Sequence, residues 1–214
     1  MVAEYSHVSP MQSWDRPPPD IAVAELFERW LPAAFAASGY RAPAGAPIVR
    51  ASISGSDGGS WELRADEATL SVGPAGREPP DVWLRQSVAD LRVSLGGTDP
   101  DLPALLPPGV AMHHILFGDP RDVELLRQVS GRLLFELEGR RRRRWALDVG
   151  VGKAGVSAGR PRTTLRVDAA TFEGLRSGAL PPMQALLEGR LKLEGDRGLA
   201  MQVLLLFGSR LARR

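Results

Sequence analysis

Short segments in which hydrophobic and polar residues alternate with period two make up much of this sequence, and segments of helical periodicity lie between them. Strict alternation over a few residues is typical of a strand with one buried face. The expected strands are residues 49–55, 60–66, 68–73, 81–86, 131–139, 143–150, 154–159, 163–167 and 190–194. The expected helices are residues 21–38, 88–97, 122–129, 169–178, 182–188 and 199–207.

The N-terminal tail and the helix ends carry recognisable sequence signals. Residues 1–20 end in a triple proline and are expected to form a poorly ordered tail, with Trp14 as its one anchor. Asp20 is expected to cap the helix of residues 21–38, in which Pro32 predicts a kink or a new turn. Ser87 and Asp168 are expected to cap the two helices that follow the fourth strand of each series.

The most informative segment of the sequence is residues 188–207, EGRLKLEGDRGLAMQVLLLF. Leu191 and Leu193 alternate with charged residues, as in a strand with one buried face. Gly195 breaks this strand, and Asp196 is expected to cap the next helix. From Leu199 nearly every position is apolar, which is more than one core face requires. Such a helix is expected to be enclosed, to contact another subunit or to form a wall of an apolar cavity.

These residues resemble the C-terminal half of the sterol carrier protein type 2 family, also called the SCP-2 sterol-binding domain. The matching residues are Phe172, Leu175, Gly178, Gly189, Leu191, Leu193, Glu194, Gly195, Asp196, Leu199, Ala200 and Phe207. The resemblance extends back to Gly131 and covers roughly the last 85 residues. It implies an α+β fold, in which a twisted, mostly antiparallel sheet carries helices on one side and an apolar tunnel for lipids lies between them.

The order of elements in the first half of the chain is repeated in the second. Trp61 aligns with Trp145, while Leu84, Leu91 and Gly97 align with Leu165, Phe172 and Gly178 at one shift of 81 residues. The segment from Ile115 likewise resembles the segment from Leu191, and Gly118-Asp119 stands where Gly195-Asp196 stands. The sequence therefore predicts a tail over 1–20, a degenerate sterol-carrier-like unit over 21–129 and a lipid-binding unit over 130–214.

The ligand is expected in the second unit, because prolines interrupt the first unit and its last helix is half charged. The candidate ligand-binding residues are Phe172, Leu175, Met183, Leu186, Leu187, Met201, Leu204, Leu205 and Phe207. Methionines adapt to ligands of varied shape. Some of these side chains are expected to belong simply to the core.

Composition narrows the remaining possibilities. Hydrophobic residues at 43% and charged residues at 24% are ordinary values for a globular protein. The absence of Cys excludes disulfides and thiolate metal sites. No apolar run reaches the ~18 residues of a membrane span, and no secretory signal is visible, so a cytoplasmic protein is expected. Heavy use of Arg, Ala, Gly and Pro is typical of a GC-rich bacterial coding bias.

The five arginines Arg140, Arg141, Arg142, Arg143 and Arg144 form the one notable charge cluster. They are expected to be a solvated hairpin tip between two strands. The alternatives are a transient contact with anionic membrane and, less favoured, nucleic acid, for which no motif is present.

No catalytic, metal-binding or cofactor-binding residue is predicted. His113 and His114 are adjacent, so on a strand they would point to opposite faces and rarely share a metal ion. They are expected at a strand start, one buried and one exposed. The glycine-rich segments lack phosphate-loop spacing, and no Gly-x-Ser-x-Gly motif occurs.

The sequence thus predicts a non-enzymatic carrier for a fatty acyl chain, sterol or polyprenoid, without a cofactor. The alternative is a small enzyme or accessory protein that acts on a hydrophobic intermediate of lipid, quinone or natural-product biosynthesis.

Overall fold

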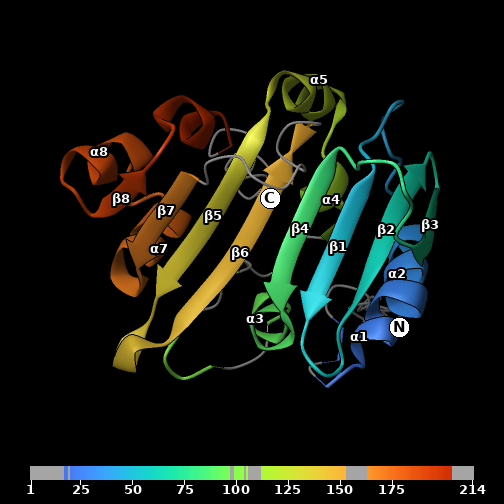
Figure 1. The fold of residues 1–214 in the computed structure, drawn as a ribbon, viewed down its shortest axis with the longest axis horizontal. Helices are drawn as coiled ribbons and strands as arrows, with labels where there is room; N and C mark the ends of the chain where they lie inside the picture. Colours follow the sequence, from blue (N-terminus) through green and yellow to red (C-terminus); the bar gives the residue numbers. More distant parts are fainter. Residues whose placement is uncertain are drawn as a thin grey trace, which may run out of the picture.

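A single eight-stranded sheet runs through the computed structural model, which describes residues 17–18, 20–96, 99–103, 105, 112–152 and 163–203 (Figure 1). Its strands, in chain order, are β1 (Val49–Ser54), β2 (Gly59–Asp66), β3 (Thr69–Pro74), β4 (Val82–Ser87), β5 (Gly131–Glu138), β6 (Arg144–Val151), β7 (Thr163–Asp168) and β8 (Leu191–Glu194). In space they follow the order β3-β2-β1-β4-β6-β5-β7-β8.

Most neighbouring strands of this sheet are antiparallel. The exceptions are β1 with β4 and β5 with β7, which run parallel. The pairing of β4 with β6, in which Leu84 lies opposite Val149, joins the first and second halves of the chain. The prediction of a mostly antiparallel sheet in an α+β fold is confirmed. The strand expected at 154–159 lies outside the described residues.

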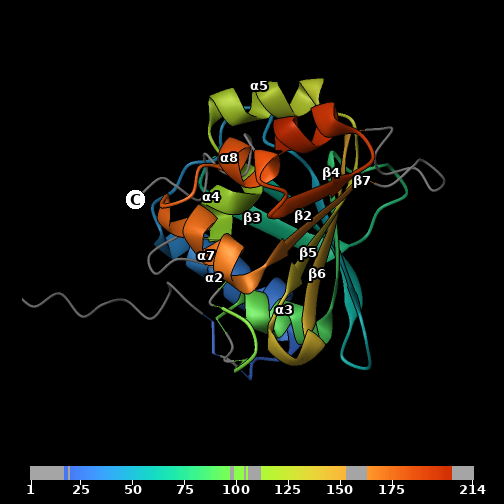
Figure 2. The same cartoon turned by 90° about the vertical axis from the view of Figure 1, so that its left-hand side faces the viewer.

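The helices gather on one face of the sheet (Figure 2). They are α1 (Val23–Glu25), the π-helical turn η1 (Leu26–Trp30), α2 (Leu31–Ala37), α3 (Val88–Ser94), α4 (Met112–Phe117), α5 (Pro120–Gln128), α7 (Ala169–Ser177) and α8 (Pro182–Leu187), and residues 197–203 are also helical. The apolar sides of the strands meet these helices in one continuous core. Leu63, Leu137 and Leu165 are almost completely buried in it.

The first helix of the chain is continuous from Val23 to Ala37, but its middle turn is π-helical. Pro32 has no amide hydrogen, and its ring crowds the carbonyl one turn before it. The amide of Leu31 instead bonds the carbonyl of Leu26, five residues back. Where the sequence predicted a kink or a new turn at Pro32, the structure has a widened, π-helical turn just before it.

Asp20 does not cap this helix, contrary to the prediction. The N-cap residue is Ala22, which provides no side-chain bond. The carboxylate of Asp57, in the turn between β1 and β2, accepts the hydrogen bond of the Val23 amide at 3.3 Å. Asp57, which is distant in sequence, thus takes the capping role that was predicted for Asp20.

The caps predicted at Ser87 and Asp168 are confirmed. Ser87 accepts a hydrogen bond from the Asp90 amide, and Asp168 accepts one from the Thr171 amide. Asp119 and Asp122 form a reciprocal capping box at the start of α5.

A second prediction is wrong: Met112–Phe117 forms α4 and is not a strand. His113 therefore lies on a helix, where successive side chains are about 100° apart. Its ring contacts Tyr40 and Phe35, with centroid separations of 4.7 and 6.0 Å.

The face of the sheet opposite the helices carries rows of paired charges. Glu62 is only 7% exposed and receives hydrogen bonds from Arg50 and Arg64, at 2.8 and 2.7 Å. Farther along, Arg132 pairs with Asp148 at 2.5 Å. Arg85 lies 4.0 Å from the centroid of the Trp83 ring, a cation–π distance. Oppositely charged neighbours across strands stabilise the register of such a sheet.

Candidate functional site

The candidate ligand site is built from α7, α8 and the helix of residues 197–203. Asp168 caps the start of α7 by accepting a hydrogen bond from the Thr171 amide at 2.7 Å. Gly178 ends α7 in the left-handed conformation, which glycine adopts without strain. Asp196 holds the start of the last helix through the Leu199 amide at 3.1 Å. This cap agrees with the sequence.

The last helix lies close to β5 because strand β5 begins with glycine. A Cβ atom at Gly131 would overlap the side chain of Leu199. Leu199, Ala200 and Val203 are buried, whereas Gln202 is exposed. The described part of this helix thus has one buried face and one solvent-exposed side.

The nine candidate ligand-binding residues fall into three groups. Phe172, Leu175 and Leu186 are partly buried against the core, and Met201 is also half-buried. Met183 and Leu187, one turn apart on α8, are 51% and 82% exposed. The residues that lie outside the described part of the chain are Leu204, Leu205 and Phe207. That these side chains line a cavity stays a prediction.

Thr171, in the first turn of α7, was not predicted to matter. Its side chain is 1% exposed, and its hydroxyl group forms no hydrogen bond within the described residues. A buried hydroxyl without a partner costs roughly 1–3 kcal/mol. The sequence marks Thr171 only as the third residue after a cap, so its burial could not be predicted.

The arginine run forms the turn between β5 and β6. Residues Arg140–Arg142 make a short 3₁₀ turn, η2, in which Arg141 and Arg142 have positive φ angles of 50° and 62°. Arg143 pairs with Asp90 and Asp99, each at 3.0 Å, and is only 30% exposed. Arg141 is 86% exposed. One arginine therefore anchors the turn to the body of the protein, and the hairpin tip itself is solvated.

These ion pairs alter the pKa of their members. The backbone amide of Asp101 and the Arg143 guanidinium hold the pKa of Asp99 below its usual range. Burial alone would raise the pKa of Glu62, but the hydrogen bonds from Arg50, Arg64 and the Gly76 amide outweigh it, and the pKa is lowered. The hydrogen bonds to Asp148 raise the pKa of Arg132. Each of these shifts favours the charged form of its group, so the ion pairs of Asp99, Glu62 and Arg132 stabilise the fold.

Within the described residues, no three His, Cys, Asp or Glu side chains are placed so that they could hold a metal ion. In the same part of the chain, no helix is long and apolar enough to cross a membrane.

Comparison with known proteins shows which family the second half of the chain is similar to. The model of the SCP-2 sterol transfer family matches residues 112–207. The resemblance predicted from the sequence is thereby confirmed, and the family implies lipid or sterol binding or transfer. The match begins at α4, ahead of the predicted boundary at residue 130.

Two curated proteins illustrate the relationship. Hydroxysteroid dehydrogenase-like protein 2 of Xenopus tropicalis is 33% identical over 84 residues, which cover 37% of this chain and 20% of that protein. Peroxisomal multifunctional enzyme A of Dictyostelium discoideum is 33% identical over 97 residues, covering 42% and 22%. The chain thus spans about a fifth of the length of these relatives.

Solved sterol carrier proteins also resemble this chain. The sterol carrier protein domain 2 of Helicoverpa armigera covers 42% of this chain and 76% of its own, with 25% identity and a TM-score of 0.32. Sterol carrier protein 2 of Yarrowia lipolytica covers 44% and 79%, with 18% identity and a TM-score of 0.33.

Proposed function

We propose that this protein carries a hydrophobic ligand, a fatty acyl chain, sterol or polyprenoid, in an apolar tunnel of its second half. The observation that carries the proposal is the match of residues 112–207 to the SCP-2 sterol transfer family. The tunnel would lie between α7, α8 and the helix that begins at Arg197. Each methylene group moved from water into such a site contributes about 0.8 kcal/mol, so a long chain is held without any ionic contact.

The partial burial of the candidate residues supports this location. A side chain enclosed on all sides contributes only to the core, whereas Phe172, Leu175, Leu186 and Met201 keep part of their surface accessible. On α8, Met183 and Leu187 add apolar surface at i and i+4, on one side of the helix. These side chains, with Leu204, Leu205 and Phe207, are the ligand contacts that we propose.

A variant of the last helix tests this site. Met201→Trp should obstruct the tunnel and abolish uptake of a fluorescent fatty acid, while the melting temperature changes little. Gln202→Trp is the matched control, because it places the same indole on the exposed edge of the same helix. Equal uptake by both variants, or a wild type that takes up no lipid, would reject the tunnel.

A second candidate is an accessory role beside an enzyme. It is favoured by the two curated relatives, whose names describe a dehydrogenase-like protein and a multifunctional enzyme and in which the matched region is about a fifth of the length. In that role the chain would present a hydrophobic intermediate to a catalytic partner. Mass spectrometry of lipid recovered after incubation separates the roles of carrier and enzyme, because a carrier or accessory protein returns its ligand chemically unchanged.

We also propose that the two halves are repeated units, a degenerate one over 21–129 and a ligand-binding one over 130–214. Strands β2-β1-β4 and β6-β5-β7 share their order and directions, antiparallel and then parallel. The caps Ser87 and Asp168 and their partner amides, Asp90 and Thr171, stand at the same shift of 81 residues.

The two sets of three strands differ in register by two residues. A shift of two residues keeps every side chain on the same face of the sheet. Trp61 lies opposite Ala51, and Ala51 lies opposite Leu84. Trp145 lies opposite Leu137, which lies opposite Val167 rather than Leu165. An experimental structure tests the repeat: with the three strands of each half superposed, α3 should fall on α7, and helices that diverge would reject the duplication.

A further inference from the structure

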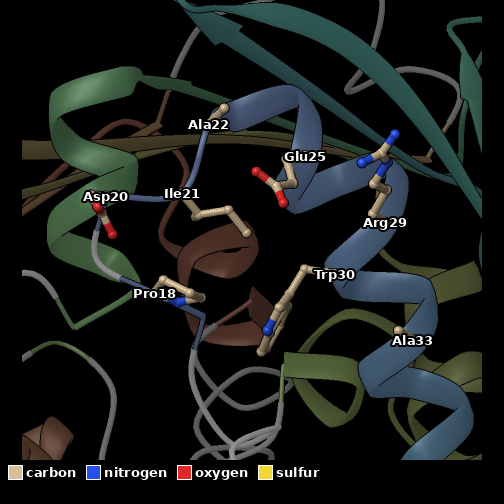
Figure 3. Close-up of a pocket in the computed structure, with 8 residues that line it drawn as sticks. All are labelled: Pro18, Asp20, Ile21, Ala22, Glu25, Arg29, Trp30 and Ala33. Atoms are coloured by element: carbon tan, nitrogen blue, oxygen red, sulfur yellow. The ribbon is translucent and has the colours of Figure 1, made fainter.

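A pocket of about 560 Å³ lies beside the first helix, outside the region that matches the SCP-2 family (Figure 3). It is lined by the residues that lead into the helix and by one side of the helix itself. These residues are Pro18, Asp20, Ile21, Ala22, Glu25, Arg29, Trp30 and Ala33. Its volume falls within the range of small-molecule sites, roughly 300–1,000 Å³.

Apolar side chains, two carboxylates and one guanidinium line the pocket. Ile21 and Trp30 are half-buried and approach each other from the two sides of the pocket, with Pro18 beside them. Figure 3 shows the Glu25 carboxylate directed toward Ile21, Asp20 at the Pro18 side, and the Arg29 guanidinium pointing away. Neither carboxylate has an ion-pair or hydrogen-bond partner in the described part of the chain.

The helix that carries these side chains is firmly positioned. Phe27 stacks on Trp61 with ring centroids 4.7 Å apart, and Glu28 accepts the indole hydrogen bond of Trp61 at 3.0 Å. The π-helical turn of Leu26–Trp30 adds a residue to this turn, which shifts the angular position of Glu25 relative to Trp30. Single π turns inside helices occur frequently at functional sites.

We propose that this pocket binds an organic cation, an ammonium group on a short apolar body. The aromatic face of Trp30 attracts a cation, and the carboxylates of Glu25 and Asp20 neutralise its charge. Pro18 and Ile21 contact the apolar body. An anion of the same shape would meet two like charges at this site. The site is independent of the tunnel proposed in the second half.

Calorimetric titration of the full-length chain with hexyltrimethylammonium tests the pocket, with hexanoate as the anionic probe of equal chain length. We expect saturable one-site binding of the cation and none of hexanoate. Glu25→Gln should weaken binding about two- to fivefold, and Trp30→Leu roughly 3- to 30-fold. Glu124→Gln, which removes an exposed carboxylate on α5 away from the pocket, is the matched control and should not weaken binding.

Phosphatidylcholine vesicles distinguish two sources of the ammonium group, a lipid headgroup and a free organic cation. Co-sedimentation that Glu25→Gln reduces would indicate a lipid headgroup, and binding of the soluble probe alone would indicate a free organic cation. No saturable binding of hexyltrimethylammonium, or equal binding by wild type and Glu25→Gln, would overturn the proposal. Fatty-acid uptake should be unaffected by Glu25→Gln, so failure here is distinct from failure of the tunnel.

Discussion

Removing the charge of Arg143 should destabilise the protein, although four other arginines surround it in sequence. Arg143 donates to Asp99 and Asp90 at 3.0 Å each, and those carboxylates are themselves only 19% and 13% exposed. Hydrogen bonds to charged groups contribute roughly 1.5–3 kcal/mol when enclosed. Because the guanidinium is partly solvated, we expect about 2 kcal/mol for Arg143→Met, which lowers the melting temperature of a chain this size by about 4–8 °C.

Thermal unfolding followed by circular dichroism measures this effect, and Arg141→Met is the matched control. Arg141 is 86% exposed and lies 4.0 Å from Asp101, so its replacement should change stability by less than about 0.5 kcal/mol. The pKa of Asp99 is lowered in the fold, so the contribution of this pair is present above the usual Asp range and is lost as the pH falls through the lowered value. Equal destabilisation by both variants, or a difference that persists in acid, would refute the reasoning.

Two further predictions follow from buried polar groups. The lowered pKa of Glu62 means that its ion pairs with Arg50 and Arg64 stabilise the fold above the usual pKa range of a glutamate and lose this effect as the pH falls through the lowered value. Urea midpoints measured across that range should fall for wild type and stay flatter for Glu62→Gln; parallel curves would contradict this. Thr171→Val should raise stability by about 1–2 kcal/mol, because it removes a buried hydroxyl without a partner; a lower urea midpoint would show that the hydroxyl is bonded.

The strands and caps could be predicted because their signals are local. Trp61 and Leu63 alternate with polar neighbours, and both are buried on the helical side of β2. Ser87 and Asp168 each follow a strand and precede an apolar helical turn, which is the pattern of an N-cap. A side chain that bonds an amide three residues away needs no information from the rest of the chain.

The errors arose where a distant contact decides the structure. The segment of residues 112–117 ends in the short apolar run Ile115–Phe117, and a run this short does not distinguish a strand from a helix by periodicity. As helix α4 it places Phe117 against Phe35, with ring centroids 5.9 Å apart. Asp57 replaces Asp20 at the first helix only because the β1–β2 turn lies nearby. The pairing of β4 with β6 is equally non-local, so the sequence could not show that the two halves share one sheet.

The candidate site was predictable in part for the same reason. The helical spacing of Phe172 and Leu175 is visible in the sequence, but the depth to which each side chain is buried depends on the helices packed against it. Met183 and Leu187 were grouped with them, yet they are exposed. The pocket at Trp30 escaped prediction because it depends on a π turn and on the path of the chain before the helix.

The two halves differ in how their interiors are filled, and this difference bears on where a ligand could bind. In the first half, Phe35 and Phe117 are 1% and 0% exposed and meet edge to face beneath Tyr40, whose hydroxyl donates to the carbonyl of Gly118. Aromatic rings thus occupy the space between the first helix and α4. In the second half, Phe172 and Leu175 keep accessible surface. A ligand needs room that side chains have not taken, so the aromatic filling of the first half supports placing the proposed tunnel in the second.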